Sequence, residues 1–368
     1  MSSYKFDNIP DRLEWSKLDC VGQIPIVRVG HSACFVLNAI LTSVRDDHYE
    51  RGCIYILGGA NPSQCFADIH MLTLSSLKWT KIIDNEETLR KYEHSTVYYP
   101  LKNSIIYFGG ANTEKNFNDV NQFNIAQKAF QILTVGSNIV SPRTHHTSVI
   151  INDSFYIFSG GDKQSKAVCD SELYRFDIET RTWETVQVHG IPPEQRHGHC
   201  MLAVNRTLYL HGGMDNRTFF KTLYSIDLEQ QTLHWTEYKT ESNWPMARAA
   251  HGGVAWDERL YIFGGLGQGG QALNDLWSWD CTTKQWTELC CRNQSIISPR
   301  LDFACCLIQI DKSRLEQQSH ENYDETSSSN DCQKSVHKNL VALMFIHGGT
   351  DTEGEVFDDC FILRIDEK

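Results

Sequence analysis

The chain has 368 residues, of which 41% are apolar and 11% aromatic, and its formal net charge is −12. This acidic balance argues against nucleic acid and anionic membranes as direct partners, because both select a basic surface. No apolar run reaches the length of about 18 residues that a membrane-spanning helix needs, and the N-terminus lacks the apolar segment of a signal peptide. The thirteen cysteines are therefore expected to be reduced thiols in a cytoplasmic protein.

In chain order, each repeated unit opens with a basic residue three positions before a histidine. Arg28 and His31 open the first unit. Lys91 replaces the arginine in the second unit, and Phe303 replaces the histidine in the last. The opening residues are Arg28, Lys91, Arg143, Arg196, Arg248 and Arg300.

An apolar run and a pair of glycines come next in every unit. Runs such as 55–57 and 261–263 predict strands that are buried on both faces. Glycines at the end of such a strand suit a positive φ or a close approach of two backbone segments. The pairs follow one another at steps of 51, 51, 52, 52 and 84 residues: Gly58-Gly59, Gly109-Gly110, Gly160-Gly161, Gly212-Gly213, Gly264-Gly265 and Gly348-Gly349.

A variable loop, a short strand and an aromatic residue complete the unit. Each unit therefore contains four predicted strands, and one such sheet cannot bury its own apolar faces. Six sheets in a ring can, so the sequence predicts an all-β, six-bladed propeller that takes up residues 1–368 as one domain. The aromatic residues follow the first glycine by 21 to 23 positions: Trp79, Phe130, Trp183, Trp235 and Trp286.

The sixth unit lacks its aromatic residue. At the other end of the chain, residues 12–18 resemble the missing outer strand, and Trp15 resembles the missing tryptophan. We therefore expect the N-terminal strand to complete the C-terminal blade, which closes the ring and leaves no exposed central edge. The alternative is a frayed N-terminal tail.

Two insertions interrupt the period. The first lies near 38–51, and the second spans about 311–339 and is rich in Ser, Glu, Gln and Asn. With few large apolar residues, the second segment cannot offset its ordering entropy and is predicted to be a disordered loop. The serines at 327–329 could be phosphorylated there, but a tolerated surface insertion without a regulatory role is the favoured interpretation.

Catalytic and metal-binding motifs do not stand out. The chain has no H-E-x-x-H, G-x-S-x-G or Walker sequence. His146, His199 and their equivalents recur once per unit, which indicates a structural role between blades. His145-His146 and the 197/199 pair have no cysteine or carboxylate at ligand spacing beside them. The sequence predicts no catalytic residue, no metal site and no cofactor.

The repeat arginines have two interpretations. Each precedes the innermost strand, so Arg28, Arg143, Arg196, Arg248 and Arg300 are expected around the mouth of the central channel. A ring of guanidinium groups there could bind carboxylates of a partner bidentately. Alternatively, each arginine pairs with a carboxylate of its own blade or the next one, and this second interpretation is favoured.

The loops after the glycine pairs share that face with the arginines. They differ from one another while the strands repeat, and variable loops on a rigid scaffold are where binding usually occurs. We therefore predict a partner-binding surface to which Asn61, Asn112, Arg217 and Glu353 contribute.

The repeats resemble the kelch family over the whole chain. Several stretches, including 58–62, 109–112 and 348–360, are similar to kelch-motif effectors of late-endosomal Rab GTPases. The insertion just before the last glycine pair adds to the likeness. The resemblance implies a cytoplasmic, non-catalytic propeller that binds a GTP-loaded Rab GTPase. It also implies peripheral recruitment to endosomal membranes and a role in vesicle transport to the trans-Golgi network.

Other functions remain open at this stage. Some kelch propellers are substrate receptors of ubiquitin ligases, which usually carry a further adaptor-binding domain. Others oxidise sugars or isomerise sialic acids, and a mutarotase would need little more than an arginine and a general acid. A pure scaffold is the remaining alternative.

Overall fold

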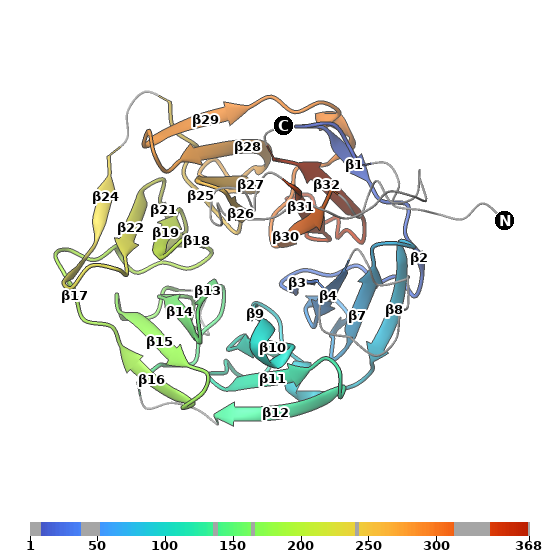
Figure 1. The fold of residues 1–368 in the computed structure, drawn as a ribbon, viewed down its shortest axis with the longest axis horizontal. Helices are drawn as coiled ribbons and strands as arrows, with labels where there is room; N and C mark the ends of the chain where they lie inside the picture. The colour runs from blue at the N-terminus through green and yellow to red at the C-terminus, as the bar shows by residue number, and fades with distance from the viewer. Residues whose placement is uncertain are drawn as a thin grey trace, which may run out of the picture.

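The computed structural model describes residues 9–37, 52–134, 139–162, 166–239, 243–312 and 339–366. Viewed along its shortest axis, the molecule is a ring of six antiparallel sheets around a central axis (Figure 1). The first three sheets are β3 (Ser32–Val36), β4 (Cys53–Leu57), β7 (Ile69–Thr73) and β8 (Lys78–Ile83); β9 (Ser95–Tyr99), β10 (Ser104–Phe108), β11 (Val120–Asn124) and β12 (Ala129–Thr134); and β13 (Ser148–Ile151), β14 (Ser154–Phe158), β15 (Leu173–Asp177) and β16 (Thr182–Thr185).

The remaining three sheets repeat the same order from the axis to the rim. They are β18 (Cys200–Val204), β19 (Thr207–His211), β22 (Leu223–Asp227) and β24 (Thr236–Tyr238); β26 (Gly252–Trp256), β27 (Arg259–Gly267), β28 (Ala272–Asp280) and β29 (Gln285–Leu289); and β30 (Ala304–Asp311), β31 (Leu340–His347), β32 (Cys360–Arg364) and β1 (Trp15–Lys17).

The innermost strands close into a circle. β3 contacts β9 and β30, β13 contacts β9 and β18, and β26 contacts β18 and β30 (Figure 1). The second strands β4, β10 and β14 are buried along their whole length, as their apolar runs predict. Their side chains pack between neighbouring blades, so that each sheet supplies the core of the next. The predicted six-bladed all-β propeller is confirmed.

Short elements complete the molecule. β2 (Val21–Gly22) pairs with β8, and β17 (Val188–His189) pairs with β23 (Leu233–His234), both in parallel. β25 (Arg248–Ala249) pairs with β27, while β5 (Ala60–Asn61) with β6 (Gln64–Cys65) and β20 (Met214–Asp215) with β21 (Thr218–Phe219) form small hairpins. In the part of the chain that the structure describes, the single-turn 3-10 helices are η2 (Glu87–Leu89), η3 (Pro100–Lys102) and η4 (Gln294–Ile296). Within the described ranges, no helix has the length and hydrophobicity to cross a bilayer.

The glycine pairs are required because a repeat histidine, or Phe303 at its place in the sixth unit, packs closely against the glycines. A Cβ on Gly109 would lie 2.8 Å from the ring of His146 in the next blade. A Cβ on Gly110 would lie 2.9 Å from Cβ of His94 in its own blade. Both glycines also have positive φ, 67° and 85°. The repeat histidine and the glycine pair therefore form one interlocking contact between consecutive blades.

The third blade shifts this pattern by one residue. There Ser159, with φ 47°, occupies the place of the first glycine, and Gly160 occupies the second. The carbonyl of Ser159 accepts from Arg143 Nη1 at 3.0 Å, as the carbonyl of Gly58 accepts from Arg28. Gly161 is therefore already the first residue of the following loop. The even spacing of glycine pairs in the sequence conceals this shift.

The N-terminal strand closes the ring as predicted. β1 pairs antiparallel with β32, with Trp15 opposite Leu363, and becomes the outer strand of the sixth sheet. Trp15 is fully buried and its ring centroid lies 4.9 Å from that of Phe263 in the fifth blade. Because β2 pairs with β8 of the first blade, residues 15–22 connect the last blade to the first.

Most of the two predicted insertions lies outside the described residues, namely 38–51 and 313–338. At the edge of the second insertion, Asp311 still belongs to β30, where it pairs with Leu340. The backbone N–H of Lys312 donates to the carbonyl of Asn339 at 2.7 Å. The insertion therefore emerges from the end of the β30–β31 hairpin.

Candidate protein-binding face

A closed ring of backbone hydrogen bonds marks the centre of the candidate face. Its six members stand one residue before each repeat histidine or Phe303, and each N–H donates to the carbonyl of the member before it at 2.6–3.1 Å. All six have positive φ, between 47° and 64°. Four are not glycine, so the closed ring must hold them in a conformation that costs free energy locally. The members are Gly30, Glu93, His145, Gly198, Ala250 and Asp302.

The variable loops attach to this ring directly. Val29 pairs antiparallel with Ala60, and Leu301 pairs with Thr350, so the residue before a ring member binds the residue after a glycine pair. The same bridge recurs between Tyr92 and Ala111 in the second blade. The ring and the loops after the glycine pairs therefore lie at one face of the propeller, as the sequence predicts.

Three side chains of the ring interact at the channel mouth. His145 Nε2 lies 2.9 Å from Asp302 Oδ1, and His145 Nδ1 lies 3.4 Å from Glu93 Oε2. His145 and Asp302 are three blades apart, so this contact crosses the channel. Burial opposes the charge of His145, but the two carboxylates outweigh it and raise the pKa of His145 to about 9. Burial also raises the pKa of Glu93. The three side chains line a cavity of about 140 Å³ at the centre of the face.

The pKa values of the repeat histidines shift in the opposite direction to that of His145. His94, His199 and His251 are fully enclosed, and burial lowers the pKa of each to about 3. His94 Nε2 contacts Ser32 Oγ at 2.9 Å, and His146 Nε2 contacts Ser95 Oγ at 2.8 Å, both across a blade boundary. Neutral histidines between blades fit the structural role that the sequence indicated. Within the described ranges, no group of three His, Cys, Asp or Glu side chains has the arrangement of a metal site.

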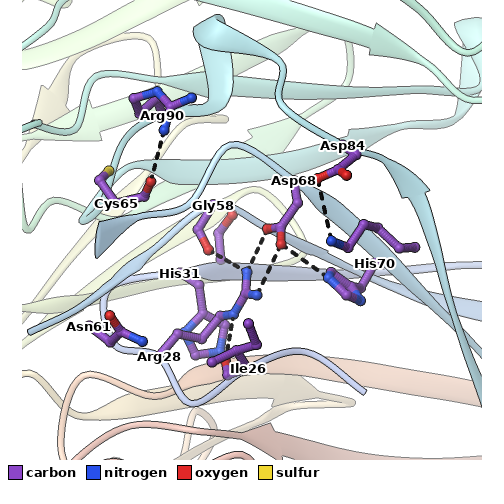
Figure 2. A network of polar contacts seen from close by, with 12 residues as sticks. Ile26, Arg28, His31, Gly58, Asn61, Cys65, Asp68, His70, Asp84 and Arg90 are labelled. Carbon is purple, nitrogen blue, oxygen red and sulfur yellow. Dashed lines mark hydrogen bonds and ion pairs between the residues drawn. The ribbon is translucent and has the colours of Figure 1, made fainter. Parts of the chain in front are cut away.

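The arginines do not form an exposed ring. Arg28, Arg143, Arg196, Arg248 and Arg300 are fully buried, so their guanidinium groups are not offered to a partner at the surface. Arg28 pairs with Asp68 at 2.7 Å and also donates to the carbonyl of Gly58, as Figure 2 shows. The same buried pair recurs as Lys91–Asp119, Arg143–Asp170, Arg248–Asp275 and Arg300–Asp359. The alternative interpretation from the sequence, internal ion pairs, holds for four of the five arginines, and Lys91 forms the same pair in the second blade.

The four predicted loop residues divide into two kinds. Asn61 is half-buried, and its side-chain oxygen accepts from the backbone N–H groups of residues 63 and 64. Asn112 does the same with the N–H groups of residues 114 and 115. These amides hold the shape of their loops. Arg217 and Glu353 are exposed at the tips of theirs.

Sequence reasoning missed two features of the face. It treated His145 only as part of a possible metal pair, although the residue before each repeat histidine has a shared role. It also missed the aspartates, which stand two positions after an apolar residue, as Asp68 follows Phe66 and Asp359 follows Phe357. That apolar-x-Asp pattern was a usable signal for the partners of the arginines.

Exposed apolar side chains precede the buried arginines. Ile191 is 88% exposed and stands five residues before Arg196, and Ile26 is 53% exposed and stands two residues before Arg28. A partner that covers such side chains removes apolar surface from water, and this burial favours binding. The set found in these linkers is Ile24, Ile26, Ile139, Ile191, Met246 and Ile296.

Comparison with known proteins agrees with this architecture. The family model of the KLHDC2/KLHL20/DRC7 Kelch-repeats domain matches residues 48–170 and 159–315. The chain belongs to the kelch-repeat family. It is 34% identical over 374 residues to the mouse protein named Rab9 effector protein with kelch motifs, an alignment that covers 97% of this chain and 95% of the relative. The rat protein of the same name is 32% identical over 97% of both chains. The human one is 35% identical over 58% of this chain and 56% of its own length.

Proposed function

We propose that this kelch propeller is a non-catalytic binding module that acts as an effector of a Rab GTPase. The observation that supports it most is a kelch architecture similar almost end to end to proteins named as Rab9 effectors. The candidate face adds physical support. Its loops vary, its linkers expose apolar side chains, and its ionisable groups at the centre are engaged with one another.

The proposed partner is the GTP-bound form. An effector must prefer one nucleotide state, because a ligand that binds two states equally shifts nothing between them. In GTPases the γ-phosphate orders the switch loops, so a contact with those loops is lost in the GDP form. Recruitment of the cytoplasmic propeller to endosomal membranes by such a GTPase, in support of transport to the trans-Golgi network, is part of the same proposal.

The proposed contact lies on the loops after the glycine pairs. Arg217 and Glu353 are exposed there and carry opposite charges, which can pair with complementary charges of a GTPase. Asn61 and Asn112 contribute mainly by holding their loops in shape. The buried arginines contribute through the rigidity of the scaffold beneath the loops.

A pulldown tests the proposal. The propeller should capture one or a few Rab proteins when they are loaded with a non-hydrolysable GTP analogue, and lose them with GDP. Arg217→Glu and Glu353→Lys should weaken capture while leaving the melting temperature unchanged. Lys128→Glu is the matched control, since Lys128 is exposed in the turn between β11 and β12, at the other end of the strands. Equal capture of both nucleotide forms across the whole Rab set would overturn the effector proposal.

A further inference from the structure

The fourth blade breaks the ion-pair pattern of the other five. In each of those blades, an aspartate two positions after an apolar residue faces the buried basic residue at 2.6–2.9 Å. In the fourth blade Phe220 keeps its apolar place, but Thr222 stands where the aspartate belongs. Arg196 is nevertheless retained and fully buried. It thus lacks the internal carboxylate that every other blade provides.

The threonine replaces the aspartate only in part. Arg196 Nη1 donates to the carbonyl of Gly212 at 3.0 Å and to Thr222 Oγ1 at 3.4 Å, and Nε donates to the carbonyl of Glu194 at 2.8 Å. Nη2 is buried and makes no hydrogen bond. The equivalent atom of Arg248 contacts Asp275 at 2.6 Å. Burial lowers the pKa of Arg196 to about 10, although Tyr224 and Glu194 favour its charge.

Glu194 covers the guanidinium from outside. Its Oε2 lies 3.6 Å from Arg196 Nη2, too far for a hydrogen bond, and its side chain is 71% exposed. An exposed, loosely held carboxylate is a weak partner, because solvent screens it and its side chain keeps its rotamer freedom. The aspartates that pair with the arginines of the other blades are only 9–25% exposed.

A cavity adjoins this position. It measures about 470 Å³ and is lined by residues of the third-blade loop, the linker and the fourth-blade loop. Two of its lining residues lie next to the guanidinium of Arg196. One is Glu194, and the other is Phe220, whose ring centroid lies 4.1 Å from Arg196 Cζ. Because Glu194 lines the cavity and its Oε2 lies 3.6 Å from Nη2, a group that takes its place would approach the guanidinium from the cavity. The lining residues are Ser171, Glu194, Gln195, Asp215, Thr218 and Phe220.

We propose that this cavity is a docking site for an acidic side chain of a protein partner, whose carboxylate displaces Glu194 and pairs with Arg196 in the place that aspartate fills in the other blades. The proposal rests on the protein-binding role proposed above and names one contact within it. The five filled blades show that a carboxylate is the complementary group. A buried guanidinium without a full partner is costly, and a charge-assisted pair relieves that cost.

The walls of the cavity add selectivity. Asp215 and Glu194 are both acidic, so they oppose an anion that does not reach the guanidinium. Removing the charge of Glu194 should therefore strengthen binding, because the incoming carboxylate no longer competes with it.

The substitution Thr222→Asp tests the proposal. It restores the pattern of the other blades, so the protein should stay folded with an equal or higher melting temperature while the site is occupied from within. The probe is a fluorescein-labelled, C-terminally amidated peptide of alternating glycine and glutamate, followed by fluorescence anisotropy. Binding to the wild type should become about tenfold weaker or more in Thr222→Asp, as expected for loss of one charge-assisted hydrogen bond. Glu194→Gln should bind more tightly than the wild type.

Two controls keep the result interpretable. Asn216→Asp places the same charge on the exposed loop of the same blade and should change binding far less than Thr222→Asp does. A peptide with glutamine in place of glutamate should not bind. Equal binding of the glutamate peptide to wild type and Thr222→Asp, or equal binding of both peptides, would overturn the proposal. If Thr222→Asp still captures a GTP-loaded Rab protein as the wild type does, the effector proposal stands and this contact does not belong to it.

Discussion

At the scale of single residues, the pKa of a histidine in this fold depends strongly on its position. His145 and His146 are neighbours in the chain. The first faces two carboxylates at the channel mouth, which raise its pKa to about 9. The second is enclosed between blades, and burial lowers its pKa far below the usual range. One residue of displacement along the chain therefore separates a charged group from a neutral one.

The first prediction concerns His145. Because its pKa in the folded state lies above the ordinary value of about 6.5, its contribution to stability is complete below pH 6.5 and is lost as the pH rises through 9. Glu93 and Asp302 face it from the second and sixth blades, and His197 stacks against it at 5.9 Å. Urea unfolding of the wild type should show stability falling by on the order of 1–3 kcal/mol between pH 6.5 and 9.5.

The His145→Gln variant should lack this alkaline loss. His189→Gln is the control, since His189 is exposed on β17, and it should keep the profile of the wild type. If His145→Gln and the wild type lost stability in parallel over this range, the channel-mouth contact would not stabilise the fold.

At the scale of the elements, the pairing of β1 with β32 completes the sixth blade with the N-terminal strand. Its three register pairs link the two ends of the chain, and Leu18 N–H adds a hydrogen bond to the carbonyl of Cys360 at 2.9 Å. Trp15 packs into the cluster between the fifth and sixth blades, which includes Phe263 and Met344. Its indole N–H donates to Gln294 at 3.2 Å. β1 and β2 together therefore connect the fifth, sixth and first blades.

We expect Trp15→Ala to lower the free energy of unfolding by about 3–5 kcal/mol, the range for removing a large buried aromatic side chain. Chemical denaturation measures the loss. Lys17→Ala, at the exposed end of the same strand, should cost less than about 0.5 kcal/mol.

Deleting residues 1–20 should expose the edge of β32 and promote aggregation, because an unpaired central edge recruits other strands. Light scattering on warming would detect this. A soluble deletion variant that unfolds cooperatively at the temperature of the full chain would show that the pairing is dispensable.

At the scale of the whole molecule, the repeat histidines that are buried at five of the six blade boundaries should make the fold less stable in acid. For His94, His199 and His251, burial lowers the pKa from 6.5 to about 3. A depressed folded pKa gives stability that is present above pH 6.5 and is lost as the pH falls towards 3, because the unfolded chain binds the protons first. The effects of the separate blades add.

We therefore expect the free energy of unfolding to fall steeply between pH 6.5 and 4.5, by about 1.4 kcal/mol per pH unit for each such histidine. Urea midpoints measured across this range give the slope. His251→Phe should reduce the slope, and the sixth blade already carries Phe303 at the equivalent position. An unchanged slope in this variant would mean that other groups take up the protons.

The sequence alone determined the number of blades, their four-strand pattern and the closing strand. These features depend on local rules: apolar runs form buried strands, glycines end them, and a missing outer strand must come from the other end of the chain. Trp15 could be placed correctly because its unit was incomplete in a way that only one segment could repair. The loops after the glycine pairs could also be placed on one face, since antiparallel order fixes which ends of the strands coincide.

Only the tertiary structure decided what the ionisable side chains do. His145 meets Asp302 across 157 positions of sequence, and no local pattern specifies a contact across the channel. The repeat arginines are buried, and four of the five pair with an aspartate that stands in or shortly before the third strand of the same blade. Ser159 shows that an even spacing of glycines can hide a shift of one residue. The missing hydrogen bond of Arg196 Nη2 becomes evident only when the fourth blade is compared with the other five. Periodicity fixes the scaffold because it is a property of the chain. Charge pairing belongs to the closed ring, whose geometry exists only after all six blades have packed together.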